Sequence, residues 1–179
     1  MKYNLDKHHR RSIRLQGYDY SSPGAYFITV CTHQRECLFG EITDGEMRLN
    51  ELGQIAANVY LWLAMQYSYV HLDAWVVMPN HLHGILVLTD PCRGVSRNAP
   101  TEDATTRKSL GRLIGAFKTV STKRINLMRD TSGSVVWQRN YYEHIIRNEK
   151  SLHYIRQYIH HNPVSWQQDQ LHPDNPSKW

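Results

Sequence analysis

The spacing of hydrophobic residues changes several times along the chain, and each change indicates a new element. Residues 25–32 are aromatic or β-branched almost throughout, which is typical of a buried strand. Residues 38–49 predict a short hairpin, because the Asp-Gly pair at 44–45 is a favoured hairpin turn. Residues 51–67 then carry an apolar stripe at helical spacing, and Asn50 can cap the start of that helix.

The second half of the chain repeats these two patterns. Residues 69–78 and 81–88 are two strand-like runs joined by only two residues, which favours an antiparallel pair. Helical spacing returns over 109–128, and the other faces of that helix carry basic side chains. Residues 135–137 are Val, Val and Trp, and we expect them to form the last strand of the sheet.

The order strand, helix, strand, strand, helix, strand predicts a ferredoxin-like (RRM-like) α+β fold. In this fold an antiparallel sheet packs helices on one face, and we expect the other face to be open to a substrate. A further helix over 148–161 follows the core and stops before a proline. The length fits one domain over 1–179, with a basic arm at 1–20, a mobile loop at 89–108 and a tail at 165–179.

Composition limits the classes of function. The chain has 21 Lys and Arg against 16 Asp and Glu, a net charge of +5, and this balance favours a polyanionic partner. A hydrophobic fraction of 41% excludes a wholly disordered chain. Three cysteines without a C-x-x-C pair favour the reducing cytoplasm, and no apolar run is long enough to span a membrane.

Basic side chains gather in the N-terminal arm and on the helix at 109–128. If the polyanionic partner is DNA, we expect phosphate contacts, which give affinity but little sequence discrimination, from Lys7, Arg10, Arg11, Arg14, Lys118 and Lys123.

Two histidines at the start of the strand 81–88 carry the candidate chemistry. The side chains of His81 and His83 project to one face of a strand, while Leu82 points to the other face. Two imidazoles on a rigid backbone suit a divalent metal ion. An H-x-H pair alone is weak support, because many such pairs are merely exposed.

The last helix carries a second candidate group of polar and aromatic side chains. Tyr158 and Asn162 are four residues apart and share a face of its last turn, and Tyr154 extends that face by one turn. The alternative is that these tyrosines are buried only for packing. Spacing alone does not assign a chemical role to Tyr158 rather than to Tyr154, Tyr141 or Tyr142.

Several segments taken together resemble the single-tyrosine HUH transposases, and the REP-associated tyrosine transposases in particular. The likeness extends from about residue 24 to 164, and the combination is far more specific than any one piece. The segments are 75–84 (WVVMPNHLHG), 110–118 (LGRLIGAFK), 136–139 (VWQR), 142–147 (YEHIIR) and 158–163 (YIHHNP).

The resemblance implies a metal-dependent transposase with a ferredoxin-like nuclease core. His81 and His83 match the metal-binding pair, Tyr158 matches the nucleophile, and Asn162 matches the polar residue that completes the metal site. Such an enzyme cuts and rejoins single-stranded DNA, here REP-like hairpins, through a 5′-phosphotyrosine. Mg²⁺ or Mn²⁺ would suit this ligand set, although imidazoles also accept Zn²⁺ or Ni²⁺.

Two other functions stay open at this point. One is an HUH nicking endonuclease of replication or conjugation, which the small size of the chain disfavours. The other is an inert protein that binds DNA hairpins, which the presence of both histidines and the tyrosine disfavours. Glu143 and His144 either support the metal ligands or are structural. The expected partner is single-stranded DNA that forms a hairpin. We expect the protein to act as a monomer or a homodimer and to have no membrane partner.

Overall fold

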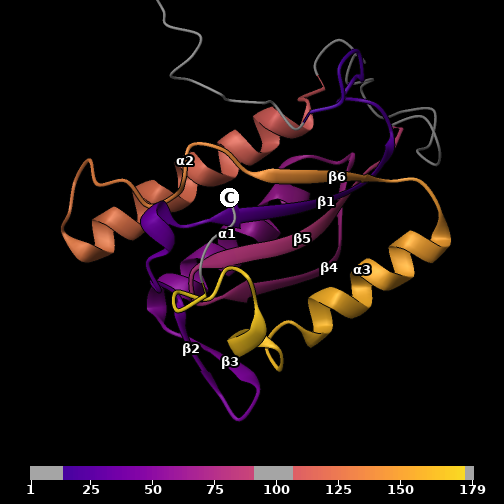
Figure 1. Ribbon diagram of the computed structural model, residues 1–179. Helices are drawn as coiled ribbons and strands as arrows, with labels where there is room; N and C mark the ends of the chain where they lie inside the picture. Colours follow the sequence, from indigo (N-terminus) through magenta and orange to yellow (C-terminus); the bar gives the residue numbers. More distant parts are fainter. Residues whose placement is uncertain (1–13, 91–106, 176–179) are drawn as a thin grey trace, which may run out of the picture.

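The computed structural model describes residues 14–90 and 107–175 (Figure 1). Its main sheet has four antiparallel strands in the order β4-β5-β1-β6, so the two central strands are β1 and β5. This arrangement confirms the predicted ferredoxin-like α+β class. The strands are β1 (Gly24–Cys31), β4 (Val70–Met78), β5 (His81–Leu88) and β6 (Tyr142–Ile146). The helices are α1 (Glu51–Gln66), α2 (Leu110–Arg129) and α3 (Glu149–His161).

The larger core lies between the sheet and the helices α1 and α2. Alternate residues of β1, such as Tyr26 and Ile28, are fully buried on this face, and Leu82 of β5 joins them. Tyr60 of α1 and Phe117 of α2 meet above them with ring centroids 5.9 Å apart. The alternation predicted at the start of β5 is confirmed, and β1 shares it, because the even-numbered residues of both strands face these two helices.

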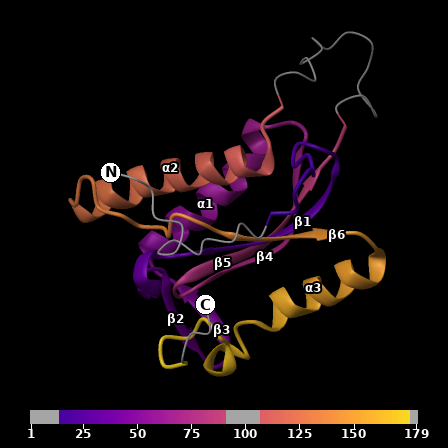
Figure 2. The ribbon, with the colours of Figure 1, turned by 45° about the horizontal axis from the view of Figure 1, so that its top comes forward.

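The opposite face of the sheet, which we expected to be open, carries α3 (Figure 2). Phe27 and Ile85 project from the odd-numbered side of β1 and β5 and pack against Ile159 of α3. Arg156 also fixes the helix to β4, because its guanidinium donates two hydrogen bonds to the Asp73 carboxylate, at 2.6 and 2.8 Å. The end of α3 is thereby held over the strand that carries the two histidines.

The sequence predicts the hairpin correctly but misplaces the last strand of the sheet. The hairpin of β2 (Gly40–Thr43) and β3 (Glu46–Leu49) is confirmed, with positive φ at Asp44 and Gly45. The strand expected at 135–137 is wrong: Trp137 makes one isolated bridge to Thr32, and the edge strand is β6. The Trp137 side chain instead packs in the core against Phe117 of α2.

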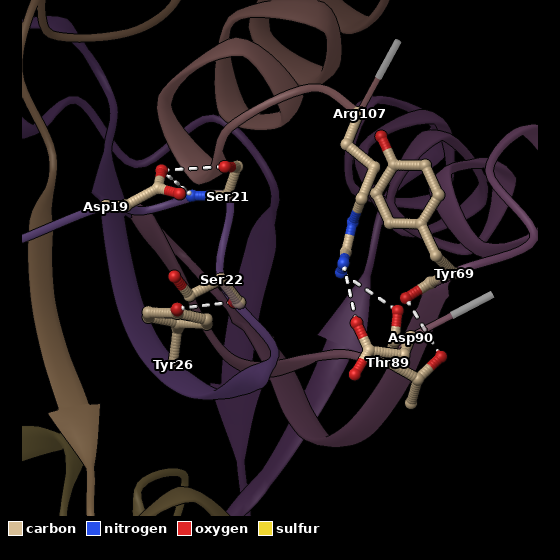
Figure 3. A network of polar contacts seen from close by, with 8 residues as sticks. All are labelled: Asp19, Ser21, Ser22, Tyr26, Tyr69, Thr89, Asp90 and Arg107. Carbon is tan, nitrogen blue, oxygen red and sulfur yellow. Dashed lines mark hydrogen bonds and ion pairs between the residues drawn. The ribbon is translucent and has the colours of Figure 1, made fainter. Parts of the chain in front are cut away.

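A polar network pins the two ends of the segment 91–106 (Figure 3). Arg107 donates from Nη2 to the Thr89 carbonyl at 2.8 Å and from Nη1 to Asp90 at 3.2 Å. Its guanidinium also lies 5.0 Å from the centre of the Tyr69 ring. The predicted mobile loop, and the predicted DNA contacts Lys7, Arg10 and Arg11, lie mostly or wholly outside the described residues.

The lengths and hydropathies of the helices bear on whether one of them could cross a membrane. No helix in the described part of the chain combines the length and the apolar character that a membrane crossing requires.

Candidate active site

His81 and His83 begin β5 and lie side by side on the face that α3 covers. In the sheet they are opposite Cys31 and Thr29 of β1. Their ring centroids are 4.4 Å apart, and both side chains are almost fully buried. The strand period thus delivers two imidazoles to one place, as the sequence predicts.

Hydrogen bonds at the Nδ1 atoms orient both rings. The side chain of Asn80 donates from Nδ2 to the carbonyls of Arg35 and Leu171, which fixes its Oδ1 toward His81 Nδ1 at 2.8 Å. Because Oδ1 only accepts, His81 carries its proton on Nδ1 and presents the Nε2 lone pair to the site. His83 Nδ1 lies 2.8 Å from the Thr29 hydroxyl, which can either donate or accept, so this contact orients the ring without fixing its tautomer.

Two buried polar atoms at the site have no hydrogen-bond partner among the described residues. They are His81 Nε2 and Asn162 Oδ1. An unsatisfied buried polar atom costs about 1–3 kcal/mol, so native proteins rarely leave two together. Both atoms are metal ligands by chemistry, one an imidazole nitrogen and the other an amide oxygen. The residues present therefore fit a divalent cation.

A carboxylate that the sequence analysis missed belongs to the same site. Asp169 follows the short helix η4 (Trp166–Gln168) in the tail and is buried. One ligand atom each of Asp169, His81 and His83 lie within 4.8 Å of one another. Asp169 also accepts a hydrogen bond from Asn162 Nδ2 at 2.9 Å, which directs Asn162 Oδ1 away from the carboxylate. The tail shows no periodic pattern, so only the three-dimensional contact reveals this residue.

Tyr158 lies at the mouth of the site. Its hydroxyl is 3.1 Å from His83 Nε2, and its ring packs against those of His83 and Phe27 with centroids 5.1 and 6.0 Å away. The residue is nevertheless 43% exposed, so the hydroxyl faces the histidines while one edge of the ring faces solvent. The residue can therefore be reached from solvent.

The rival tyrosines lie elsewhere. Tyr154 is 59% exposed and lies beside His153 and Lys150 of its own helix. Tyr141 accepts a hydrogen bond from Arg14. Tyr142 packs beside Phe27, with the ring centroids 6.2 Å apart. The hydroxyl contact with the histidine pair thus distinguishes Tyr158 from all three.

Burial controls the protonation of the site. It lowers the pKa of His81 to about 3, an effect that the nearby Asn162 partly offsets, and it lowers the pKa of His83 well below its ordinary value. Both imidazoles are therefore neutral at pH 7 and need lose no proton to bind a metal. Burial, with a smaller contribution from the Asp169 charge, raises the pKa of Tyr158 to about 12. A nearby cation would favour the phenolate.

A cavity of about 370 Å³ opens beside the nucleophile candidate. Its volume lies within the ~300–1,000 Å³ range of ligand sites in proteins. The lining side chains come from the end of α3 and from the tail: Tyr158, His161, Asn162, Ser165, Gln168, Asp169 and Gln170.

Two of the residues predicted to contact DNA, Lys118 and Arg14, make polar contacts within the protein. Lys118 is largely buried and donates to the carbonyls of Gln138 and Asn140, both at 2.8 Å, so its ammonium stabilises the segment before β6. Arg14 lies 3.4 Å from Glu143, which is buried on the α1 and α2 side of the sheet. A DNA contact by Lys118 or Arg14 stays a prediction, and Glu143 lies on the opposite face of the sheet from the two histidines.

The two other residues considered at the same stage are on the surface. Lys123 is exposed on α2, where a DNA contact stays a prediction. His144 is exposed on the edge strand β6, opposite Phe27 of β1.

Comparison with known proteins gives one close sequence relative and one useful structure. A Haemophilus influenzae protein, named only as uncharacterized, is 43% identical over 180 residues, which cover 97% of this chain and 98% of that protein. The structure of a REP-associated tyrosine transposase bound to a REP hairpin covers 88% of this chain and 74% of its own, with a TM-score of 0.59. Its sequence identity is 23%, so the likeness establishes a shared fold. No family model matches the chain.

Proposed function

Because this chain belongs to the same family as the uncharacterized Haemophilus influenzae protein, whose name states no activity, we propose its function from the site. The chain is a metal-dependent DNA transposase that cleaves and rejoins single-stranded DNA through a 5′-phosphotyrosine. Its substrate is a REP-like hairpin with single-stranded flanks. The observation that carries the proposal is the Tyr158 hydroxyl, 3.1 Å from His83 Nε2 and beside unsatisfied metal-ligand atoms. The fold shared with a REP-associated tyrosine transposase supports it.

The ligand set indicates which cation the site would hold. Nε2 of His81 and of His83, the Asp169 carboxylate and the Asn162 amide oxygen would bind it. Oxygen ligands together with imidazoles suit Mn²⁺, and Mg²⁺ with water completing its shell. When bound, the cation would withdraw charge from the non-bridging phosphate oxygens and favour the phenolate of Tyr158.

The chain's own residues then carry out the exchange. Tyr158 Oη forms a bond to the phosphorus while the bond from phosphorus to the 3′ oxygen breaks. The phenol loses a proton and the 3′ oxygen gains one, so the phosphodiester energy is retained in the tyrosyl ester. Phe27 and His83 hold the tyrosine ring from two sides and keep its hydroxyl directed inward. Attack by another 3′-OH reverses the step and joins two strands without ATP.

Burial of the histidine pair contributes to selectivity for this exchange. His81 and His83 are buried beneath Tyr158 and the tail, and the cavity beside them opens to solvent. Tyr158 lines the cavity and is partly exposed, whereas the two histidines do not line it and are almost fully buried. The arrangement favours attack by tyrosine over attack by bulk water.

The test uses a labelled single-stranded DNA taken from beside the protein's own gene, with its hairpin and flanks. The protein is incubated with it and Mn²⁺ or Mg²⁺, and the products are separated on a denaturing gel. We expect a covalent protein–DNA adduct that chelator abolishes and that blunt duplex of the same sequence does not form. A second labelled strand with a free 3′-OH should become joined to the first.

The outcomes separate the three candidate functions. An adduct with strand joining indicates a transposase, and an adduct that never joins a second strand indicates a nicking endonuclease. Tight binding of the hairpin with no adduct under any metal indicates an inert binding protein and contradicts the proposal.

A further inference from the structure

A strained turn follows β1 at the end of the sheet where the histidines lie. Gln34 and Arg35, in the short helix η2 (His33–Arg35), are consecutive non-glycine residues with φ of 53° and 59°. The left-handed region disfavours residues with a Cβ, and two in succession persist only where the surroundings hold them. Such strain is concentrated at functional sites, so the contacts that hold this turn are informative.

Those contacts lead directly to the metal-ligand candidates. The Thr32 hydroxyl lies 2.8 Å from the Glu36 carbonyl and 2.9 Å from the Asn80 carbonyl. The side chain of Asn80 donates to the Arg35 carbonyl at 3.2 Å. Asn80 is also the residue that fixes the proton of His81. One asparagine therefore sets both the orientation of a metal ligand and the backbone of Arg35.

The Arg35 side chain extends toward the mouth of the site. Its Nη1 donates to the carbonyl of Gln170 at 3.3 Å, and Gln170 lines the cavity together with Tyr158 and Asn162. Arg35 is partly buried, and its charge also lowers the pKa of His81, though less than burial does. A permanent cation thus lies close enough to act on His81 and also contacts a residue that lines the cavity.

Three other basic side chains of the described region make contacts away from the cavity. Arg156 is bound to Asp73, and Lys118 to main-chain carbonyls behind α2. Arg14 pairs with Glu143 on the far side of the sheet. Arg35 differs from these three because its guanidinium donates to Gln170, which lines the same cavity as Tyr158.

We propose that Arg35 binds the scissile phosphate of the DNA and holds it beside Tyr158. This inference rests on the proposed function and adds a substrate-binding residue to it. A guanidinium has five N–H donors in a planar fork, so it can keep its bond to Gln170 and still bind a phosphate. Its charge would also stabilise the negative charge that develops on the phosphate oxygens during transfer.

The test measures binding in a Tyr158→Phe background, where the DNA is not cut. Arg35→Gln removes the charge but retains a donor for the Gln170 carbonyl, and Arg124→Gln removes an exposed charge from α2 as the matched control. Each protein is titrated with a fluorescent hairpin DNA and with a series of the same DNA, each member carrying one neutral methylphosphonate linkage. Circular dichroism and thermal unfolding monitor the fold.

We expect Arg35→Gln to weaken binding of the unmodified DNA about tenfold or more and to reduce the salt slope by about 0.7. For one methylphosphonate position, the Arg35→Gln protein and its Tyr158→Phe parent should bind the DNA equally well, because the phosphate charge that Arg35 contacts is already absent. That position should be the linkage at which the wild type forms its adduct. Arg124→Gln should show no such position. Arg35→Gly also removes the charge, but it relieves the left-handed strain and so should not destabilise the turn. It should weaken DNA binding as much as Arg35→Gln does if the lost charge, rather than misfolding, is responsible.

Three results would overturn the inference. They are undiminished binding by both Arg35 variants, a loss that every methylphosphonate position shares, and a contact at a linkage other than the one cut. Failure of the proposed function has a different signature. If wild-type protein forms no adduct while the Arg35 effect still maps to one linkage, Arg35 binds phosphate and the cleavage reaction is wrong.

Discussion

Replacing Asp169 by Asn tests how the tail contributes to the metal site. The carboxylate accepts from Asn162 Nδ2 at 2.9 Å and from the Leu171 main-chain N–H at 2.6 Å. An asparagine can still accept from Leu171, but its amide group then faces the amide group of Asn162. Two donors cannot bind each other, so Asn162 must turn and present nitrogen rather than oxygen to the cation. The substitution therefore removes one charged ligand and misorients a second.

The magnitude follows from these losses. One charge-assisted hydrogen bond contributes about 1.5–3 kcal/mol. Loss of a group that orients a metal ligand typically weakens binding by about 10–100-fold, equivalent to ~1.4–2.8 kcal/mol. We therefore expect the affinity for Mn²⁺ to fall by at least tenfold. Stability without metal should change much less, because the variant also removes a buried negative charge from the neighbourhood of Tyr158.

The assay is calorimetric titration of Mn²⁺ into wild type and Asp169→Asn, with thermal unfolding at zero and saturating Mn²⁺. The wild type should gain more stability from Mn²⁺ than the variant does, since a ligand that binds only the folded state stabilises it according to its affinity. Asp174→Asn, an exposed tail carboxylate, is the matched control. Equal Mn²⁺ affinity of wild type and Asp169→Asn would refute the inclusion of the tail in the site.

Three further predictions concern protonation, packing and the rival tyrosine. Burial lowers the pKa of His81 to about 3, so below pH 6.5 the unfolded chain binds a proton that the folded chain does not. The free energy of unfolding, measured with urea, should therefore fall from pH 6.5 toward pH 3. It should fall less steeply with pH in His81→Gln, and equal pH slopes for the two proteins would contradict this. Tyr60→Phe should raise the melting temperature, because the buried hydroxyl has no hydrogen-bond partner in the described region; a fall of about 1 kcal/mol in stability would indicate a hidden partner. Tyr154→Phe should form the adduct at the wild-type rate on a denaturing gel, and its loss would reassign the nucleophile.

Periodic segments could be predicted from the sequence because their side chains alternate at fixed intervals. The period of two along β5 brings His81 and His83 together, and the helical period places Tyr158 and Asn162 at the end of α3. The capping residue Asn50 is also confirmed, since its side chain accepts from the Gly53 N–H at 2.9 Å. Local rules suffice where the neighbours of a residue are close in sequence.

Features that depend on distant contacts could not be predicted. Asp169 belongs to a tail without periodicity, and it reaches the site only because the chain turns back after Asn162. The left-handed backbone of Arg35 has no glycine to signal it and depends on Asn80, 45 residues away. Lys118 lies on the polar side of its helix by sequence, but its ammonium turns toward carbonyls some 20 residues later. In each case a tertiary contact overrides the local pattern.

The most direct test of the account is to locate the DNA on the protein after reaction. Wild-type protein is incubated with the single-stranded hairpin DNA and Mn²⁺, the DNA is digested to its last nucleotide, and tandem mass spectrometry identifies the modified residue. The account predicts a 5′-linked nucleotide on Tyr158, and no modified tyrosine in Tyr158→Phe, which should still bind metal and DNA. A nucleotide on another tyrosine, or an adduct retained by Tyr158→Phe, would contradict the assignment of Tyr158 as the nucleophile.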